Sequence, residues 1–337
     1  NLKPVMLNAN ADKFFLPLVL QLHNDGSSVC KEKCGDVLGS LLKRVNEEKM
    51  KDFFGIVKAW SDKEETRVVA LKVLGIVCDA RAKWVKGGRR AEIERILVGA
   101  IEGEMETGEE GKGDRFGEDW ERVYFALVGL EKFGGGSVGA EVVSCLSHYH
   151  PWCKLVSGRI VSGGLKKGLK GVKAGYYELV KGFGGQIDVD AKFTNDNVAM
   201  GAIRGVIAVV KLMKGGEEDA ERAKKWLFNR LAGAAKKSSG GVRMNIFKTF
   251  AGLVQVCDVH LYLGLILGSL HRAISEADAV NNETEENVVF MKELLGVIED
   301  KVGTDVFMKV YADVRTKAKE RRDARKSEIA IEKVVDP

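Results

Sequence analysis

The fold is decided by residues 30–77, which read CKEKCGDVLGSLLKRVNEEKMKDFFGIVKAWSDKEETRVVALKVLGIV. In the first third, apolar residues recur at steps of one, three or four, which places them on one face of a helix. They are Cys30, Cys34, Val37, Leu38, Leu41, Leu42 and Val45. Ser27 or Ser28 can cap this helix and Asn46 can cap the next, because their side-chain oxygens accept N–H groups of a first helical turn. A third pattern follows Asp62 and is apolar on nearly every side, which indicates a helix enclosed between neighbours.

Composition favours the same architecture over the whole chain. A single compact core stops growing near roughly 250–300 residues, and this chain has 337. Its 4 prolines are too few for the many turns of an all-β protein, and no segment alternates with period two. Helix pairs of about 35–40 residues that stack on one another are typical of HEAT and armadillo repeats. We therefore predict an all-α, HEAT/armadillo-like α-solenoid of stacked antiparallel helix pairs.

The predicted solenoid occupies residues 1–302, and residues 303–337 form a C-terminal helix with a basic extension. Residues 102–118 are acidic, rich in glycine and almost without apolar side chains, so we expect a flexible loop there. Residues 134–139 form a shorter predicted link. Glycine is abundant at 39 residues, and these two segments account for only part of that excess.

The modest net charge of +5 conceals an uneven distribution. Residues 151–250 hold 19 basic and 8 acidic side chains, whereas both flanking regions are slightly acidic. A local field of this kind attracts phosphate. Six scattered cysteines favour reduced thiols in a cytosolic or nuclear protein. The longest apolar stretch, residues 253–270, is interrupted by polar groups, so we expect no contact with a membrane.

Four candidate metal ligands lie close together in the sequence: Cys145, His148, His150 and Cys153. Structural zinc takes four such groups in a tetrahedron, but these spacings are cramped for one site. Pro151 is suited to the first position of a new helix, where its missing N–H costs nothing. We interpret the cluster as structural and predict no metal and no cofactor. Neither a nucleophile with its base nor a phosphate-binding loop is recognisable, so we predict no catalytic residues.

Two basic segments stand out as candidate sites for RNA or partner binding. The first contains Lys166, Lys167, Lys170 and Lys173. The spacing predicts a helix over residues 165–176, in which Lys166, Lys170 and Lys173 share one face beside an apolar stripe. Such a helix is either an ordinary amphipathic element with solvated lysines or a contact for a phosphate backbone.

The second basic segment follows Val314, after which no large apolar residue occurs before Ile329. Seven basic side chains lie between them: Arg315, Lys317, Lys319, Arg321, Arg322, Arg325 and Lys326. Their spacing gives two adjacent basic stripes on a helix. A helix without an apolar face gains nothing by packing on its own array, so we expect it to project outward. It is either a solvated end or a site for RNA or an acidic partner.

The stretches at residues 14–25, 150–155 and 301–337 (FFLPLVLQLHND, HPWCKL, and the segment from KVGTDVF to VVDP) resemble one known family. It is the large HEAT-repeat scaffold of the small-subunit processome, also called the down-regulated-in-metastasis family. Residues 14–25, FFLPLVLQLHND, are similar to the opening of one of its repeats. Residues 150–155, HPWCKL, resemble the start of another. Residues 301–337, which open with KVGTDVF and close with VVDP, resemble its C-terminal helix and the start of its lysine-rich tail. The stretch 160–250 resembles the family least.

The resemblance implies a nucleolar, non-catalytic ribonucleoprotein component that acts in ribosome biogenesis. It implies association with pre-ribosomal RNA, the U3 small nucleolar ribonucleoprotein and other processome proteins, in the rRNA processing that yields 18S rRNA. It implies neither a small-molecule substrate nor catalytic residues. The alternative is a protein-only α-solenoid adaptor, such as a karyopherin-like transport receptor. Those receptors tend to be acidic, and the basic segments argue against that class.

Overall fold

The computed structural model describes residues 3–107, 116–133, 138–187, 196–280 and 284–335. Every regular element in these ranges is a helix, and the β-structure in them is one isolated bridge between Val138 and Val172. The all-α prediction is therefore confirmed. The helices pack into two compact units, residues 1–173 and residues 174–337. The domain division expected at residue 302 stays a prediction.

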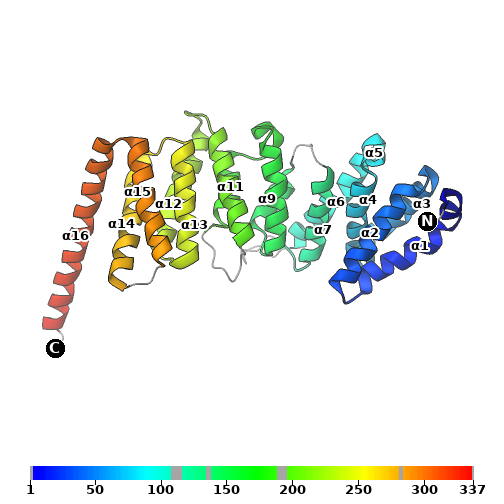
Figure 1. The fold of residues 1–337 in the computed structure, drawn as a ribbon, viewed down its shortest axis with the longest axis horizontal. Helices are drawn as coiled ribbons and strands as arrows, with labels where there is room; N and C mark the ends of the chain where they lie inside the picture. Colours follow the sequence, from blue (N-terminus) through cyan, green and yellow to red (C-terminus); the bar gives the residue numbers. More distant parts are fainter. Residues whose placement is uncertain (1–2, 108–115, 134–137, 188–195, 281–283, 336–337) are drawn as a thin grey trace. The chain divides into compact units, whose positions relative to one another are not determined.

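Unit 1 is built from helix pairs, as predicted for a solenoid. Its helices are α1 (Pro4–Asn24), α2 (Ser28–Arg44), α3 (Glu47–Ser61), α4 (Glu64–Ala80), α5 (Ala82–Trp84), α6 (Arg90–Thr107), α7 (Trp120–Phe133), α8 (Ala140–Ser144) and α9 (Pro151–Leu165). Successive pairs are α1 with α2, α3 with α4, α6 with α7, and α8 with α9. The second helices of these pairs, α2, α4, α7 and α9, also pack against one another in that order, so they form one layer of the unit (Figure 1).

The predicted caps at the start of unit 1 are confirmed. The Ser27 hydroxyl accepts the N–H of Cys30, and the Asn46 side chain accepts the N–H of Lys49. Helix α4 packs against α2, α3 and α7, which explains why it is apolar on nearly every side. On the predicted apolar face of α2, however, Cys30 and Val37 remain exposed.

The loop predicted over residues 102–118 begins later than expected, because α6 continues through Thr107. The last turns of α6 are held by buried contacts: Ile101 is fully buried, and Glu104 accepts a hydrogen bond from Arg122 of α7. Gly117 also donates its N–H to the Glu104 carbonyl oxygen. The acidic composition of this segment therefore does not reveal that one of its carboxylates, Glu104, has a partner inside unit 1. Residues 108–115 of the first predicted loop and 134–137 of the second lie outside the described residues.

Unit 2 repeats the pairing. Its helices are α10 (Tyr176–Gly184), α11 (Asp196–Leu212), α12 (Glu218–Ala235), α13 (Gly240–Val256), α14 (Leu263–Val280), α15 (Glu285–Val302) and α16 (Thr304–Val335). One layer contains α10, α12, α14 and α16, and the other contains α11, α13 and α15. Aromatic rings pack between the layers: Phe228 of α12 stacks with Phe250 of α13, with ring centroids 6.2 Å apart.

Several helical glycines allow neighbouring helices to approach closely. A β-carbon on Gly205 of α11 would overlap the ring of Phe183 of α10, which is fully buried. Likewise, Gly252 of α13 faces Ile207 of α11 with no room for a side chain. Part of the glycine excess that the loops leave unexplained therefore lies at helix–helix contacts.

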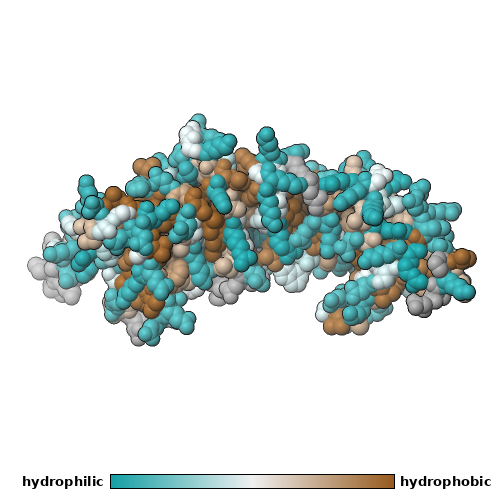
Figure 2. All heavy atoms as spheres, turned by 45° about the horizontal axis from the view of Figure 1, so that its top comes forward, coloured by the Kyte–Doolittle hydropathy of each residue, from teal (hydrophilic) through white to brown (hydrophobic). Residues whose placement is uncertain are grey.

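The surface is largely polar. Hydrophilic residues cover much of the face drawn in Figure 2, with hydrophobic residues gathered in bands between them. Among the helices that the structure describes, none has the length and apolar character needed to cross a membrane.

Candidate nucleic-acid interface

The first half of α16 anchors it to unit 2. Phe307 is buried, and its ring stacks on Tyr311 with centroids 5.5 Å apart. Tyr311 in turn meets His271 of α14 edge to face, at 5.8 Å and 90°. Gly303, with φ +87°, ends α15 and lets the chain turn directly into α16. The sequence KVGTDVF therefore supplies both the turn and the aromatic anchor.

Beyond Ala318 the helix leaves the rest of the unit. All residues from Lys319 to Glu328 are exposed, and in Figure 1 the end of α16 reaches past α14 and α15. The predicted projecting basic helix is thus present. The segment 315–328 carries seven basic and three acidic side chains. In the described part of the chain, none of the seven basic groups forms an ion pair.

The two basic stripes predicted on α16 occupy different sides of the helix. One contains Arg315, Lys319, Arg322 and Lys326, and the other contains Lys317, Arg321 and Arg325. The first stripe lies toward α14, because Arg315 and Arg322 act on His271 of that helix. Burial lowers the pKa of His271, and the charges of these two arginines add to the effect. Guanidinium and ammonium groups at helical spacing can contact successive phosphates without reading sequence.

The predicted helix over residues 165–176 is wrong. Helix α9 ends at Leu165, and the chain continues through a turn and a short 3₁₀ segment, Leu169–Gly171. Gly168 adopts φ +78°, a left-handed conformation that interrupts any helix. Gly164 and Gly171 also pack against each other so closely that a side chain on either would overlap the backbone of the other.

The four lysines are nevertheless on the surface. Lys166, Lys167, Lys170 and Lys173 are all exposed, in a segment held by Val138. Val138 donates its N–H to the Gly171 carbonyl oxygen and accepts from the Lys173 N–H, both at 2.8 Å. The lysines therefore line a bend and not one face of a helix.

The histidines of the Cys145–Cys153 cluster have separate structural roles. Pro151 is the first residue of α9, as predicted, and the His150 ring accepts the Trp152 N–H. His150 also stacks on Trp120, with centroids 3.7 Å apart. The fully buried His148 lies against Phe116, and burial lowers its pKa to about 3, with His150 and Lys154 adding to the effect.

The two thiols of the cluster are buried as well. Cys145 contacts the Glu141 carbonyl oxygen at 3.3 Å, and Cys153 contacts that of Trp120 at 3.5 Å. Burial raises the pKa of Cys153 to about 12, which disfavours the thiolate that a metal needs. Among the described residues, no group of three or more His, Cys, Asp and Glu side chains is placed to hold a metal ion.

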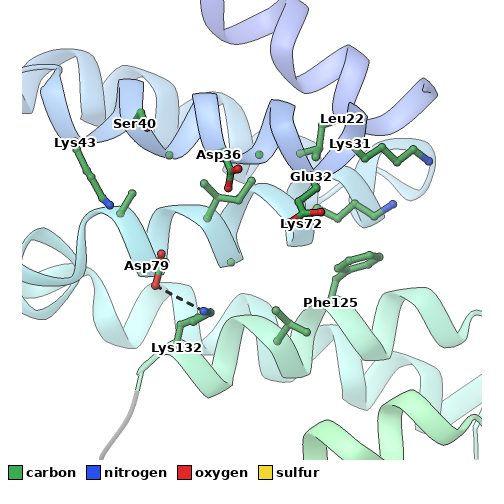
Figure 3. Close-up of a pocket in the computed structure, with 16 residues that line it drawn as sticks. Leu22, Lys31, Glu32, Asp36, Ser40, Lys43, Lys72, Asp79, Phe125 and Lys132 are labelled. Atoms are coloured by element: carbon green, nitrogen blue, oxygen red, sulfur yellow. Dashed lines mark ion pairs between the residues drawn. The ribbon is translucent and has the colours of Figure 1, made fainter. Parts of the chain in front are cut away.

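One surface feature was not found from the sequence. A groove of about 610 Å³ runs over α4 between α2 and α7 (Figure 3), and the residues that line it include Gly35, Gly39, Gly75, Ile76 and Val128. At one end, Asp79 and Lys132 form an ion pair at 3.6 Å. Gly35 and Gly39, four residues apart on α2, were the sign of this groove in the sequence. The groove itself forms only when three helices that are separated in the sequence pack together.

The other end of the groove carries Lys31, Glu32 and Lys72 (Figure 3). Lys72 lies 4.5 Å above the ring of Phe125, and Lys31 lies on the neighbouring helix (Figure 3). Burial lowers the pKa of Lys72, and the charge of Lys31 adds to this despite Glu121 at 3.7 Å. The same two lysines, after burial, lower the pKa of His23.

Comparison with known proteins agrees with the resemblance read from the sequence. The family model described as "Small subunit processome component 20 homolog, C-terminal" matches residues 178–337. That match includes residues 178–250, most of the stretch expected to resemble the family least. The chain is also 21% identical over 371 aligned positions to U3 small nucleolar RNA-associated protein 20 of Schizosaccharomyces pombe.

The second comparison covers all of this chain but only 15% of the length of the yeast protein. The family match contains α11 to α16 and nearly all of α10, including the complete projecting helix. On these two findings the chain is similar, over its residues 178–337, to the C-terminal region of the small-subunit processome component 20 family.

Proposed function

We propose that this chain is a non-catalytic scaffold segment of the small-subunit processome, acting in the nucleolus in pre-rRNA processing and 18S rRNA maturation. In this proposal its HEAT-like helix pairs hold pre-ribosomal RNA, the small nucleolar ribonucleoprotein and neighbouring assembly factors. The matching family and the yeast relative, whose names refer to the small-subunit processome and to U3 small nucleolar RNA, support this cellular role. The single observation that supports an RNA contact is the exposed basic half of α16.

The proposed mechanism at α16 is contact with a phosphate backbone. Lysine and arginine side chains that approach phosphates release bound counterions, so the affinity falls as the salt concentration rises. The arm from Arg315 to Lys326 spans about 18 Å at 1.5 Å per residue. Its charges are held at fixed spacing by a continuous helix and have no acidic partner within the described chain.

The test is charge reversal of the stripe formed by Arg315, Lys319, Arg322 and Lys326, each changed to Glu. We expect loss of co-sedimentation with pre-ribosomes and a shallower salt dependence of RNA binding. A matched control reverses four exposed lysines of unit 1, Lys13, Lys51, Lys63 and Lys83, for the same change in net charge. Equal effects of the two variants, or none from the α16 variant, would remove α16 from the mechanism.

The exposed bend that carries Lys166, Lys167, Lys170 and Lys173 is a second proposed phosphate contact. Changing the four lysines to Gln removes charge without adding acidic groups. We expect weaker RNA binding at low salt and an unchanged melting temperature, because the lysine side chains are exposed. RNA affinity equal to that of the unmodified chain at every salt concentration would exclude the bend as a contact.

A further inference from the structure

Helices α10 and α12 of unit 2 carry a cluster of aromatic and guanidinium planes that the basic-segment predictions did not include. The rings of Tyr177 and Trp226 lie 6.2 Å apart at 77°. The Arg222 guanidinium lies 4.1 Å above the Tyr177 ring, and that of Arg230 lies 5.4 Å from the Trp226 ring. We call these four side chains the stacking platform.

The helical repeat and one aspartate place these groups together. Arg222, Trp226 and Arg230 are spaced by four residues on α12, so they share one face. Asp219, in the first turn of α12, accepts the Tyr177 N–H and also a hydrogen bond from Arg222, each at 3.2 Å. The platform is therefore positioned across two helices before any ligand binds.

Trp226 is set into the surface between the two helices. Its six-membered ring lies against Gly184 of α10, where a β-carbon would come within 3.0 Å of it. Both aromatic side chains are half-buried, whereas both arginines are exposed. The rings are thus held firmly, with guanidinium groups on their solvent side.

Basic and acidic side chains both lie near the platform, and Glu178, Glu217 and Glu218 are exposed close to it in sequence. Lys181 of α10 and Lys225 of α12 are exposed close to it in sequence. On α12, Glu221 forms an ion pair with Lys224 at 2.9 Å, and Asp219 forms one with Arg222. Lys181 and Lys225 are the exposed lysines near the platform that can contact phosphates.

The surface is poorly suited to docking an apolar protein segment. Among the described residues of unit 2, the large apolar side chains that are exposed lie elsewhere: Leu261, Val289, Val297, Val306 and Met308. Neither α10 nor α12 carries one. Aromatic rings with arginine planes and flanking lysines are instead the combination on which unstacked bases bind, because every base has a face that can stack.

We infer that the stacking platform binds single-stranded RNA, with one or two unpaired bases stacked on Tyr177, Trp226 and the arginine planes. Lys181 and Lys225 would contact the adjoining phosphates. The choice of RNA over DNA rests on the proposed function; the stacking itself rests on the geometry. A duplex keeps its bases within the helix, so it cannot engage this surface in the same way.

The experiment measures binding of the full chain to a labelled uridine oligonucleotide and to an RNA duplex of equal length, by fluorescence anisotropy. Trp226→Ala and the double variant Arg222→Ala/Arg230→Ala are each expected to weaken binding to the single strand about fivefold to a hundredfold. Binding to the duplex should change much less. Trp226→Phe, which keeps a stacking ring, should bind the single strand nearly as the unmodified chain does.

Tryptophan fluorescence gives a second readout. Trp226 is the one tryptophan of unit 2, since the other four, at 60, 84, 120 and 152, lie in unit 1. Quenching by the oligonucleotide should therefore disappear in Trp226→Phe, although this variant still binds. Because the arginines are exposed, the double variant tests the platform even if Trp226→Ala impairs folding.

Single-strand binding that is unchanged in the double variant, or quenching that persists in Trp226→Phe, would overturn the inference. The α16 charge reversal has a different signature, because loss of phosphate contacts weakens single-strand and duplex binding together. A failure of the platform therefore leaves the proposed role of α16 standing, and a failure of α16 leaves the platform standing.

Discussion

The Nη1 atom of Arg122 lies 2.8 Å from Oε1 of Glu104, and the two side chains are only 11% and 6% exposed. This pair joins the last turns of α6 to the start of α7. Burial raises the pKa of Glu104 even though the Arg122 charge acts in the opposite direction. Burial thus disfavours the ionised form of Glu104 more than the Arg122 charge favours it. We therefore expect the stability of unit 1 to be sensitive to changes in this pair.

Arg122→Met should destabilise unit 1 by about 3–5 kcal/mol, because it leaves a buried carboxylate without its partner. The loss should shrink as the pH is lowered, since protonation of Glu104 removes the uncompensated charge. Urea unfolding at several pH values measures both effects. Adding Glu104→Gln to Arg122→Met should restore part of the lost stability; a further loss would contradict this account.

His148 should make unit 1 less stable in acid. Its pKa is about 3 in the folded chain and about 6.5 when unfolded, so the stability it contributes is complete above pH 6.5. That stability is lost as the pH falls from 6.5 toward 3, by at most about 4–5 kcal/mol at 1.36 kcal/mol per pKa unit. His148→Asn should flatten this part of the stability profile.

The matched control for His148 is Leu146→Val, because Leu146 is fully buried two residues away and carries no titratable group. It should lower the stability about equally at every pH and leave the acid dependence as in the unmodified chain. If the two variants show the same profile between pH 6.5 and 3, burial of His148 is not the cause.

Gly205→Ala should destabilise unit 2 by about 1–3 kcal/mol, because the new methyl group overlaps the Phe183 ring in a packed contact. Gly233→Ala is the control, since the space beside this α12 glycine is open. It should be neutral or stabilise by up to about 1 kcal/mol through higher helix propensity. Chemical denaturation of the two variants decides; a neutral Gly205→Ala would show that the helices can move apart.

Lys72→Met should raise the pKa of His23 toward its usual value, because Lys72 is the larger of the two charges that lower it. Lys31→Met should act in the same direction with a smaller effect. Titration of the His23 ring by NMR measures both. If neither variant moves the pKa, burial alone determines the protonation of this histidine.

Local signals in the sequence were sufficient where the determining contacts are also local. The caps at Ser27 and Asn46, the proline that opens α9 and the projecting basic helix follow from side chains within a few residues of each site. The helix pairing follows from apolar periodicity, because each face must be buried against a neighbour.

The sequence-based predictions were wrong where a residue far away in the sequence determines the local structure. The Lys166–Lys173 segment has helical periodicity, but Gly164 and Gly171 pack together and Val138 bonds the backbone across the bend. The end of α6 is acidic, but Arg122 covers Glu104. The groove and the stacking platform each combine side chains from two or more helices, which no periodicity within one helix reveals.

The unbroken course of α16, from its buried Phe307 to its exposed arginines, has a consequence for binding entropy. A basic tail without structure must lose conformational freedom when it settles on a polyanion, at about 1–2 kcal/mol for each residue fixed. In α16 the backbone is already ordered by the turns that pack against α14, so this cost is met during folding. The same seven charges on a broken helix would have an unchanged composition and a lower affinity.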